Sequence, residues 1–282
     1  MMQHVLYRDG NASGQFPEYS RIKAKNMTEQ YGEMLSEMKI SIVTVSFNGE
    51  AEIGRTIESV LIQNCDCLEY WIIDGASRDG TVEIAETFRA KMREKNIEYH
   101  IVSEPDEGIY DGMNKGAKLA TGDVIGFLNC GDTYEAGALE KVQERFLDSQ
   151  CDITVGNLRV IRKDGSSFIK KSRLRNYQTS RDWNHPTTFT RAALLKEYPF
   201  RKLGIHDDYG FYLQMVRQGR RIEIINEVLA SFYMGGVSNV KSLRLARKRI
   251  SDRYRFCYRL NGYSRWYLLE CIFMEMAKYF MG

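Results

Sequence analysis

Apolar runs of strand length alternate with amphipathic helical stretches from Lys39 onward. Short runs that are apolar almost throughout are typical of strands buried on both faces of a parallel sheet. Strands that alternate with helices in this way predict an α/β fold, with a mainly parallel sheet, right-handed crossovers and helices on both faces. The predicted strands are Ile40 to Ser46, Tyr70 to Asp74, Tyr99 to Val102 and Val124 to Asn129.

Helices are predicted between these strands by the spacing of apolar side chains. One helical face follows the first strand, and a second follows the second strand after the cap signal Asp79-Gly80-Thr81. Ligands of open α/β sheets bind beyond the carboxyl ends of the strands, so the residues after each strand are the candidates for chemistry. The two helical faces consist of Ile53, Ile57, Val60 and Leu61, and of Val82, Ala85, Phe88 and Met92.

The second half of the chain has a different pattern. Ile153 to Arg162 and Ser167 to Lys171 flank a turn that contains Gly165, which predicts an antiparallel hairpin. A helix is predicted from Asp208 to Arg217, before Gly219, and a short strand from Ile222 to Ile225.

Three regions follow from these patterns. Residues 1–38 are polar and weakly periodic, and form a peripheral arm with one short helix through Tyr31, Met34 and Leu35. Residues 39–240 form the α/β domain. Residues 241–282 alternate basic and apolar side chains at helical spacing, which predicts one or two basic amphipathic helices.

Charge is nearly balanced over the 282 residues, with 40 Lys and Arg against 37 Asp and Glu, and a net charge of +3. This balance argues against a dedicated nucleic-acid-binding protein, which needs a broadly basic surface. The last 42 residues differ from the rest, because they hold ten basic and three acidic side chains. This tail either packs on the domain as a solvated helix or lies on an anionic membrane surface.

Targeting signals are not evident in the sequence. No stretch of about 18 apolar residues is present, and the N-terminus lacks the pattern of a signal peptide, so a cytoplasmic protein is expected. The six cysteines form no Cys-x-x-Cys pair, which argues against a zinc ribbon and predicts reduced thiols.

Polar residues follow the first and second predicted strands. Thr44, Ser46 and Asn48 place small polar groups where the sheet opens. Asp74 ends the second strand, where its carboxylate suits the N3–H of a uracil or a ribose hydroxyl. An Asx turn that caps the next helix, formed by Asp74 and Asp79, is an equally simple explanation.

The third and fourth strands lead into segments rich in oxygen ligands. Asp106, Asp111 and Asn114 lie near the start of a helix and could bind a diphosphate and sugar hydroxyls, although acids in a first helical turn are also ordinary dipole partners. The apolar fourth strand breaks into Asn129-Cys130-Gly131-Asp132. Such a loop could hold Mg²⁺ or Mn²⁺ against phosphates, and a plain turn would look similar.

The set of motifs resembles glycosyltransferase family 2, the inverting enzymes with the Rossmann-like GT-A fold that use nucleotide-diphosphate sugars. In particular, the chain looks like bacterial exopolysaccharide and lipopolysaccharide transferases. Five segments match in family order with plausible spacing, which makes coincidence an unlikely explanation. They are Ser41 to Asn48, Ile73 to Thr81, Ser103 to Gly116, Gly122 to Leu128, and Asn129 to Asp132.

The resemblance implies that Asp74 contacts the nucleoside and that the Asn129 to Asp132 loop holds metal and diphosphate. The family usually has Asp-x-Asp in this loop, whereas Asn129 and Gly131 occupy those two positions here. We therefore expect Asp132 to be the carboxylate on the metal side, with the divalent cation bound mostly through the donor phosphates.

Two further segments look like the acceptor side of the family. The resemblance implies that Asp207 or Asp208 is the general base, and the register favours Asp208. An inverting displacement needs a carboxylate on the acceptor face to take the hydroxyl proton. His185 and His206 are candidates for contacts with the acceptor or the diphosphate, and His185 is equally well explained as a structural residue.

The sequence therefore predicts an inverting glycosyltransferase that moves a sugar, with a UDP-sugar as the expected donor, to a hydroxyl of a glycan or lipid-linked acceptor in surface polysaccharide biosynthesis. Its expected place is the cytoplasm, peripherally at the inner face of the membrane. The alternative is a non-catalytic protein that binds or senses a nucleotide sugar. A metal-binding motif with fewer acidic residues is also what a protein that has lost catalytic activity would show. A dinucleotide oxidoreductase is disfavoured, since no G-x-G-x-x-G follows a strand.

Overall fold

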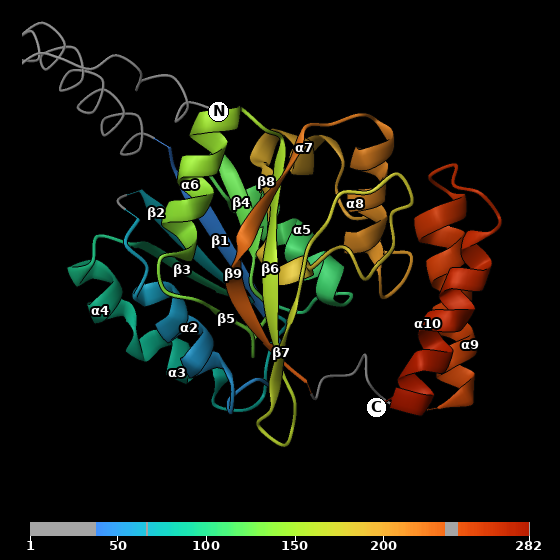
Figure 1. Cartoon of the computed structure of the whole chain (residues 1–282). Coiled ribbons are helices and arrows are strands. Elements are labelled where there is room, and N and C mark those ends of the chain that lie inside the picture. Colours follow the sequence, from blue (N-terminus) through green and yellow to red (C-terminus); the bar gives the residue numbers. More distant parts are fainter. Residues whose placement is uncertain (1–37, 66, 235–241, 282) are drawn as a thin grey trace, which may run out of the picture.

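The computed structural model describes residues 38–65, 67–234 and 242–281, and the side chains of residues 278–281 are not described. The predicted N-terminal arm with its short helix lies outside these ranges, except for Met38. Figure 1 shows a central twisted sheet with helices on its two faces and a pair of C-terminal helices at one side.

The sheet has the strand order β3-β2-β1-β4-β8-β6-β9-β5, and β7 pairs with β6. The described pairings make β1, β2, β3, β4, β6 and β9 run in one direction and β5, β7 and β8 in the other, which confirms a mainly parallel sheet. The strands are β1 Ile40–Ser46, β2 Leu68–Asp74, β3 Glu98–Ser103, β4 Val124–Phe127, β5 Thr133–Tyr134, β6 Ile153–Ile161, β7 Ser167–Lys170, β8 Thr188–Arg191 and β9 Ile222–Tyr233.

Helices cover both faces of the sheet, as the alternation predicted. Two buried clusters lie on opposite faces, because successive side chains of a strand point to opposite sides: Ile42 belongs to one cluster and Val43 to the other. The first face carries α2 Ile53–Leu61, α3 Thr81–Thr87, α4 Arg89–Glu94 and α6 Ala138–Ser149; the second carries α5 Ile109–Leu119, α7 Ala192–Glu197 and α8 Asp207–Arg217.

Several predicted elements have different bounds in the structure. The single helix expected through Val82 and Met92 is two helices, because the chain tightens at Phe88, whose N–H bonds the carbonyl of Ala85, three residues back. The predicted hairpin is confirmed as β6 and β7. The strand predicted to end at Ile225 is β9, which continues to Tyr233. It pairs with β6 along nearly all of its length.

The C-terminal tail is helical, as predicted, and packs on α8. It consists of α9 Leu243–Asp252, a π-helical turn Arg253–Arg259 and α10 Tyr267–Met281. Tyr258 is completely buried in the cluster beneath α8, and the Arg249 guanidinium lies 2.8 Å from the buried Glu275 carboxylate. Within the described residues, no helix is both long enough and apolar enough to cross a bilayer.

The parallel half of the sheet sets the position of the site. β1 lies between β2 and β4, so the carboxyl ends of these strands open on one edge of the sheet. Helix α5 is pressed against β1 at Gly116, where a Cβ would lie 2.3 Å from Val43 Cγ1. This close approach fixes the start of α5 at the same edge.

Candidate active site

Asp74 joins the ends of three strands. Its carboxylate accepts hydrogen bonds from the hydroxyls of Ser46 at the end of β1, Ser103 at the end of β3, and Ser77. The backbone N–H of Ser77 is a fourth donor, at 2.8 Å. Since a carboxylate has about four acceptor positions and Asp74 has no exposed surface, its hydrogen-bonding capacity is filled within the protein.

Two other residues, one in β1 and one just after it, were predicted to bind the nucleotide-sugar donor, and they lie in different environments. Asn48 is exposed and left-handed (φ 50°), and its side-chain oxygen accepts the N–H of Arg78. Thr44 is fully buried and shares a hydrogen bond with the Tyr70 hydroxyl. Thr44 therefore points into the core rather than into the opening at the strand ends.

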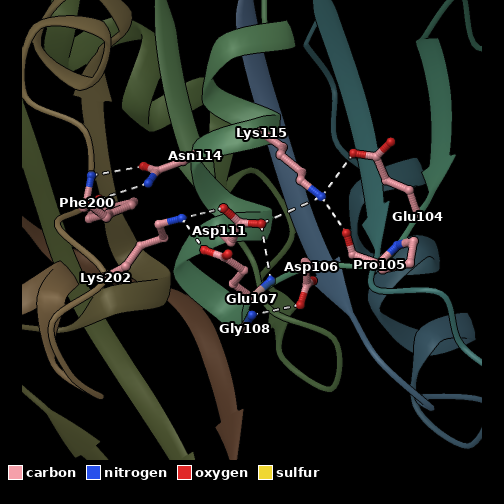
Figure 2. Close-up of polar contacts among 10 residues, drawn as sticks. All are labelled: Glu104, Pro105, Asp106, Glu107, Gly108, Asp111, Asn114, Lys115, Phe200 and Lys202. Atoms are coloured by element: carbon pink, nitrogen blue, oxygen red, sulfur yellow. Dashed lines mark hydrogen bonds and ion pairs between the residues drawn. The ribbon is translucent and has the colours of Figure 1, made fainter.

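Asp106 lies against the end of β2 because two glycines make room for it. A Cβ at Gly75 would lie 2.8 Å from Asp106 Oδ2, and one at Gly112 would lie 3.4 Å from the same atom. Its other oxygen, Oδ1, accepts the N–H of Gly108 (Figure 2). The carboxylate is thus brought beside Gly75, the residue after Asp74, with Oδ2 facing the glycine-lined space.

A charged network ties the start of α5 to the loop before α8. Lys202 lies between Glu107 and Asp111, with its Nζ 2.7 Å and 3.0 Å from their carboxylates (Figure 2). Lys115 contacts Glu104 and the Pro105 carbonyl from the other side. The hydrogen bond from Lys202 is the main reason that the pKa of Asp111 is lowered. Asp111 is therefore an ionised, paired carboxylate.

Asn114 uses both ends of its side-chain amide to hold one backbone position. The amide donates to the Phe200 carbonyl and accepts from the Phe200 N–H, at 2.9 Å each (Figure 2). The structure gives Asn114 a positioning contact across the two halves of the domain.

The loop after β4 is shaped by α2. Thr56 Oγ1 accepts the N–H of Gly131 and donates to the carbonyl of Asp132, while Arg55 Nε donates to the carbonyl of Gly131. Gly131 has a φ of 101°, which favours glycine at this turn. The Arg55 guanidinium also lies over the Tyr233 ring, 4.2 Å from its centroid.

Two side chains of this loop have oxygen atoms without a partner among the described residues. The Asn129 Oδ1 atom is buried and accepts no hydrogen bond, and no described donor bonds the Asp132 carboxylate. Burial raises the pKa of Asp132 to about 7, and the charges of His185 and Arg55 act in the opposite direction. Buried acceptors without donors fit a hard cation, so these two residues are suited to Mg²⁺ or Mn²⁺.

One group of three acids and histidines with the spacing of metal ligands occurs among the described residues, and it excludes Asp132. It consists of Glu69, Glu98 and His100, at the amino ends of β2 and β3. Lys39 lies 2.8 Å from Glu98 there, and Ser41 and Thr121 bond Glu69. The two glutamates are thus paired with neighbouring side chains and backbone, at the edge opposite the carboxyl ends of the strands, so the loop after β4 has the better ligand chemistry.

Asp208 is the second residue of α8 and is held by three donors. The Tyr110 hydroxyl and the N–H of Tyr209 bond its Oδ1 atom at 2.8 Å and 2.7 Å, and His185 Nδ1 lies 3.0 Å from Oδ2. Burial raises the pKa of Asp208, but the hydrogen bonds and charges around it, first of all those of His185, lower it below its ordinary value. About one acceptor position remains free, and 17% of the side chain is exposed.

His185 connects the two sides of the site. It lies at the start of the short 3-10 helix His185–Thr187, bonds Asp208 through Nδ1, and acts electrostatically on Asp132. Its Nε2 atom is buried and has no hydrogen-bond partner in the described structure. A cavity of about 20 Å³, room for about one water molecule, is lined by His185, Asp208 and Phe127 among others.

The remaining acceptor-side candidates have structural contacts. Asp207 is buried, and its Oδ2 atom accepts the N–H of Leu203. Desolvation is the main reason that its pKa is raised. His206 Nε2 lies 3.0 Å from the Arg253 guanidinium, so it faces the C-terminal helices rather than the strand ends.

Three residues of the site were not singled out from the sequence. Tyr110 bonds Asp208, Arg55 shapes the loop after β4, and Phe47 is 65% exposed directly after β1. The sequence signal for Phe47 was its position beside Ser46 and Asn48. Nothing local could have paired Tyr110 with a residue 98 positions away.

The model of Glycosyl transferase family 2 matches residues 41–206, which include most of the site. The chain belongs to glycosyltransferase family 2. Similar proteins include a PGL/p-HBAD biosynthesis glycosyltransferase of Mycobacterium bovis, 37% identical over 103 residues, 36% of this chain and 39% of that protein. The putative teichuronic acid biosynthesis glycosyltransferase TuaG of Bacillus subtilis is 30% identical over 132 residues, 46% of this chain and 51% of TuaG. The matched regions thus span about half or less of these relatives.

Solved structures of two proteins have the same fold as this family 2 member. TarS 1–349 of S. aureus in complex with UDP-GlcNAc matches with a TM-score of 0.60 and 17% identity, covering 86% of this chain and 73% of TarS. A mannosyltransferase of Pyrobaculum calidifontis, in complex with GDP-Man and Mn²⁺, matches with a TM-score of 0.60 and 13% identity, covering 92% and 78%. They confirm the predicted GT-A-like α/β fold.

Proposed function

We propose that this protein is an inverting glycosyltransferase that moves a sugar from a nucleotide-diphosphate sugar to a hydroxyl of a surface glycan or its lipid-linked precursor. The observation that carries the proposal is the position of His185, which bonds Asp208 and stacks on Phe127, with the ring centroids 6.3 Å apart. Phe127 ends β4 and leads into the loop suited to a metal–diphosphate group, so one imidazole contacts both the carboxylate suited to a base and the strand end before that loop.

The donor lies across the carboxyl ends of β1 to β4 in this proposal. Phe47 stacks on the base, and Asp106 Oδ2 accepts a ribose hydroxyl beside Gly75. Asp74 contributes by holding Ser46 and Ser103 in place, and contacts the nucleoside once one of these hydroxyls turns to the ligand. UDP is the proposed nucleotide, which is also present in the TarS complex.

A divalent cation is held by Asp132 and by the Asn129 side-chain oxygen in this proposal. When bound, it supplies charge stabilisation to the departing diphosphate. The Pyrobaculum mannosyltransferase structure contains Mn²⁺. Arg55, which already bonds the same loop, adds a second positive charge near the diphosphate.

Asp208 is the proposed base. The acceptor oxygen forms a bond to the anomeric carbon while the bond from that carbon to the diphosphate oxygen breaks, and Asp208 Oδ2 takes the acceptor proton. The lowered pKa keeps Asp208 ionised at neutral pH. Tyr110 and His185 hold the carboxylate in one orientation, with its remaining acceptor position available.

The experiment that tests this function uses substrate turnover and stereochemistry. With Mn²⁺ and a panel of UDP-sugars and GDP-mannose, slow hydrolysis should release the nucleoside diphosphate and a sugar whose first-formed anomer is opposite to that of the donor. Asp208→Asn should lower this rate by about 10²–10⁴-fold. The exposed Glu197→Gln, at the end of α7, is the control. Tight donor binding without turnover by the wild type would favour the alternative, a nucleotide-sugar sensor.

We also propose that the C-terminal helices bring the enzyme to an anionic membrane surface. Helix α10 and the residue before it expose an apolar stripe at helical spacing, and the same tail exposes the basic residues Arg265, Arg247 and Lys248. Basic groups attract anionic headgroups, and aromatic side chains suit the interface. The stripe consists of Trp266, Leu269, Phe273 and Met276.

The membrane proposal is tested by sedimentation with phosphatidylglycerol vesicles. Truncation of the tail is unsuitable, because Tyr258 and Tyr267 belong to the core. Trp266→Ser combined with Phe273→Ser should weaken binding at least about tenfold, since both rings leave the interface. Ile62→Ser with Leu119→Ser, exposed apolar residues just after α2 and at the end of α5, is the matched control. Equal binding by the two double variants would contradict the proposal.

A further inference from the structure

A second cavity lies at the end of α8 that is remote from Asp208. Its volume is about 440 Å³, within the range of roughly 300–1,000 Å³ found for small-molecule sites. It opens between the last residues of α8, the start of β9, and the loop around residues 174–178. Because β9 begins here, the cavity lies at the amino ends of the parallel strands, on the edge opposite the proposed donor site.

The charge of this cavity is positive. Arg175, Arg217 and Arg220 line it, and none of its described lining residues is acidic. Arg220 Nε is buried and has no hydrogen-bond partner in the described structure. A buried donor without an acceptor is destabilising, so the fold retains an unfavourable group here that an anion would satisfy.

The three arginines are held in different ways. The Arg217 guanidinium lies 5.4 Å from the centroid of the Tyr263 ring, which leaves its N–H groups available at its edges. Arg175 Nε lies 3.3 Å from Asp182, which fixes this guanidinium at the rim. Arg217 and Arg220 are therefore the two that present charge to a ligand.

The lining also suits the body of a small organic molecule. Leu174, Val216 and Ile222 supply apolar surface, and Tyr263 supplies an aromatic ring. The guanidinium fork matches phosphate oxygens in pairs, and it binds them more specifically than a lysine would. A phosphate on an organic body is the chemistry that uses both the arginines and the apolar wall.

We propose that this cavity is a binding site for a phosphate ester, with Arg217 and Arg220 on the phosphate. Its position at the opposite edge of the sheet makes it a site separate from the donor site. Tyr263 is three residues before Trp266, the first residue of the apolar stripe. The phosphate can therefore come from a soluble ester or from the headgroup of a membrane lipid.

The test measures binding of sn-glycerol 3-phosphate by calorimetry, in EDTA so that metal does not contribute. Arg217→Gln with Arg220→Gln removes the two ligands, and Arg93→Gln with Lys95→Gln removes the same charge from the exposed end of α4. The wild type and the α4 variant should bind alike, and the cavity variant about tenfold or more weaker. Arg217→Lys with Arg220→Lys keeps the charge without the fork, and should give an intermediate affinity if the glutamine variant does not fold.

A second arm uses phosphatidic acid in phosphatidylcholine vesicles and identifies the source of the phosphate. Loss of vesicle binding by the cavity variant, with retention by the α4 variant, assigns the phosphate to a lipid headgroup. Equal vesicle binding by these variants, with the loss confined to glycerol 3-phosphate, assigns it to a soluble ester. Equal binding by the two double variants in both arms, or no saturable binding by the wild type in either arm, overturns the site.

Discussion

Two buried carboxylates at one edge of the sheet differ in their surroundings. Asp74, at the end of β2, has no exposed surface and accepts hydrogen bonds from three serine hydroxyls and one backbone N–H. Asp132, in the loop after β4, is 6% exposed, accepts none from the described residues, and has a pKa raised to about 7.

This difference separates a carboxylate that stabilises the fold from one suited to a ligand. Donors around Asp74 replace the water that it loses on burial, so its charge strengthens the link between three strands. Asp132 loses its water without replacement, and its burial has a cost that a cation would offset. The two residues should therefore respond in opposite directions to removal of their charge.

The largest expected effect is on turnover. Asp132→Asn should lower the metal-dependent hydrolysis rate by about 10²–10³-fold, because it removes the one charged ligand of the proposed cation site. Glu144→Gln, on the exposed face of α6, is the matched control. A rate within a factor of two of the control would exclude Asp132 from the role.

The next effect is a pH dependence of stability without metal. The folded carboxyl of Asp132 titrates at about 7 and the unfolded one near 3.8, so the native state binds more protons between these values. Stability should fall as the pH rises through this window. Relative to Asp132→Asn, which does not titrate there, the wild type should lose on the order of 3 kcal/mol.

Urea unfolding in EDTA at about pH 5 and pH 8 measures this difference, and the other titrating groups are common to the two proteins. Above the window the asparagine variant should be the more stable protein. An unchanged stability difference between the two pH values would show that Asp132 is not buried without a partner in solution.

Asp74→Asn should have the opposite effect on stability at neutral pH. The side-chain amide presents an NH₂ group to donors that need an acceptor, so the variant should lose about 2 kcal/mol. For a chain of this size, the Tm should fall by about 4–8 °C. Thermal unfolding followed by circular dichroism measures it, and a Tm equal to that of the wild type would refute the structural role of Asp74.

The smallest expected effect is on thermal stability, when one of the four hydrogen-bond donors to Asp74 is removed. Ser103→Ala removes one of four donors, so it should cost about 1 kcal/mol, or a fall in Tm of about 2–4 °C. Ser166→Ala, in the exposed hairpin turn before β7, is the control for loss of a serine hydroxyl that bonds an aspartate. If Ser166 proved as important as Ser103, burial of the Asp74 carboxylate would not be the source of the stability that its donors provide.

Local patterns predicted most of the parallel half of the fold. β1 has the predicted bounds, and β2 and β3 extend beyond them by one or two residues. Strands β5 and β8 and helix α6 were not predicted. β5 has two residues and β8 has four, so neither gives a long apolar pattern.

The sequence by itself determined the α/β class, the polar residues after each strand, and the match to a family, because these depend on neighbours along the chain. Only the tertiary structure decided what each polar residue does. Asn114 bonds the Phe200 backbone, Thr44 faces Tyr70, and His185 contacts both Asp208 and Phe127. The reason is physical: hydrogen bonding and burial are set by groups 23 to 98 residues away, and those distances close only when the sheet forms.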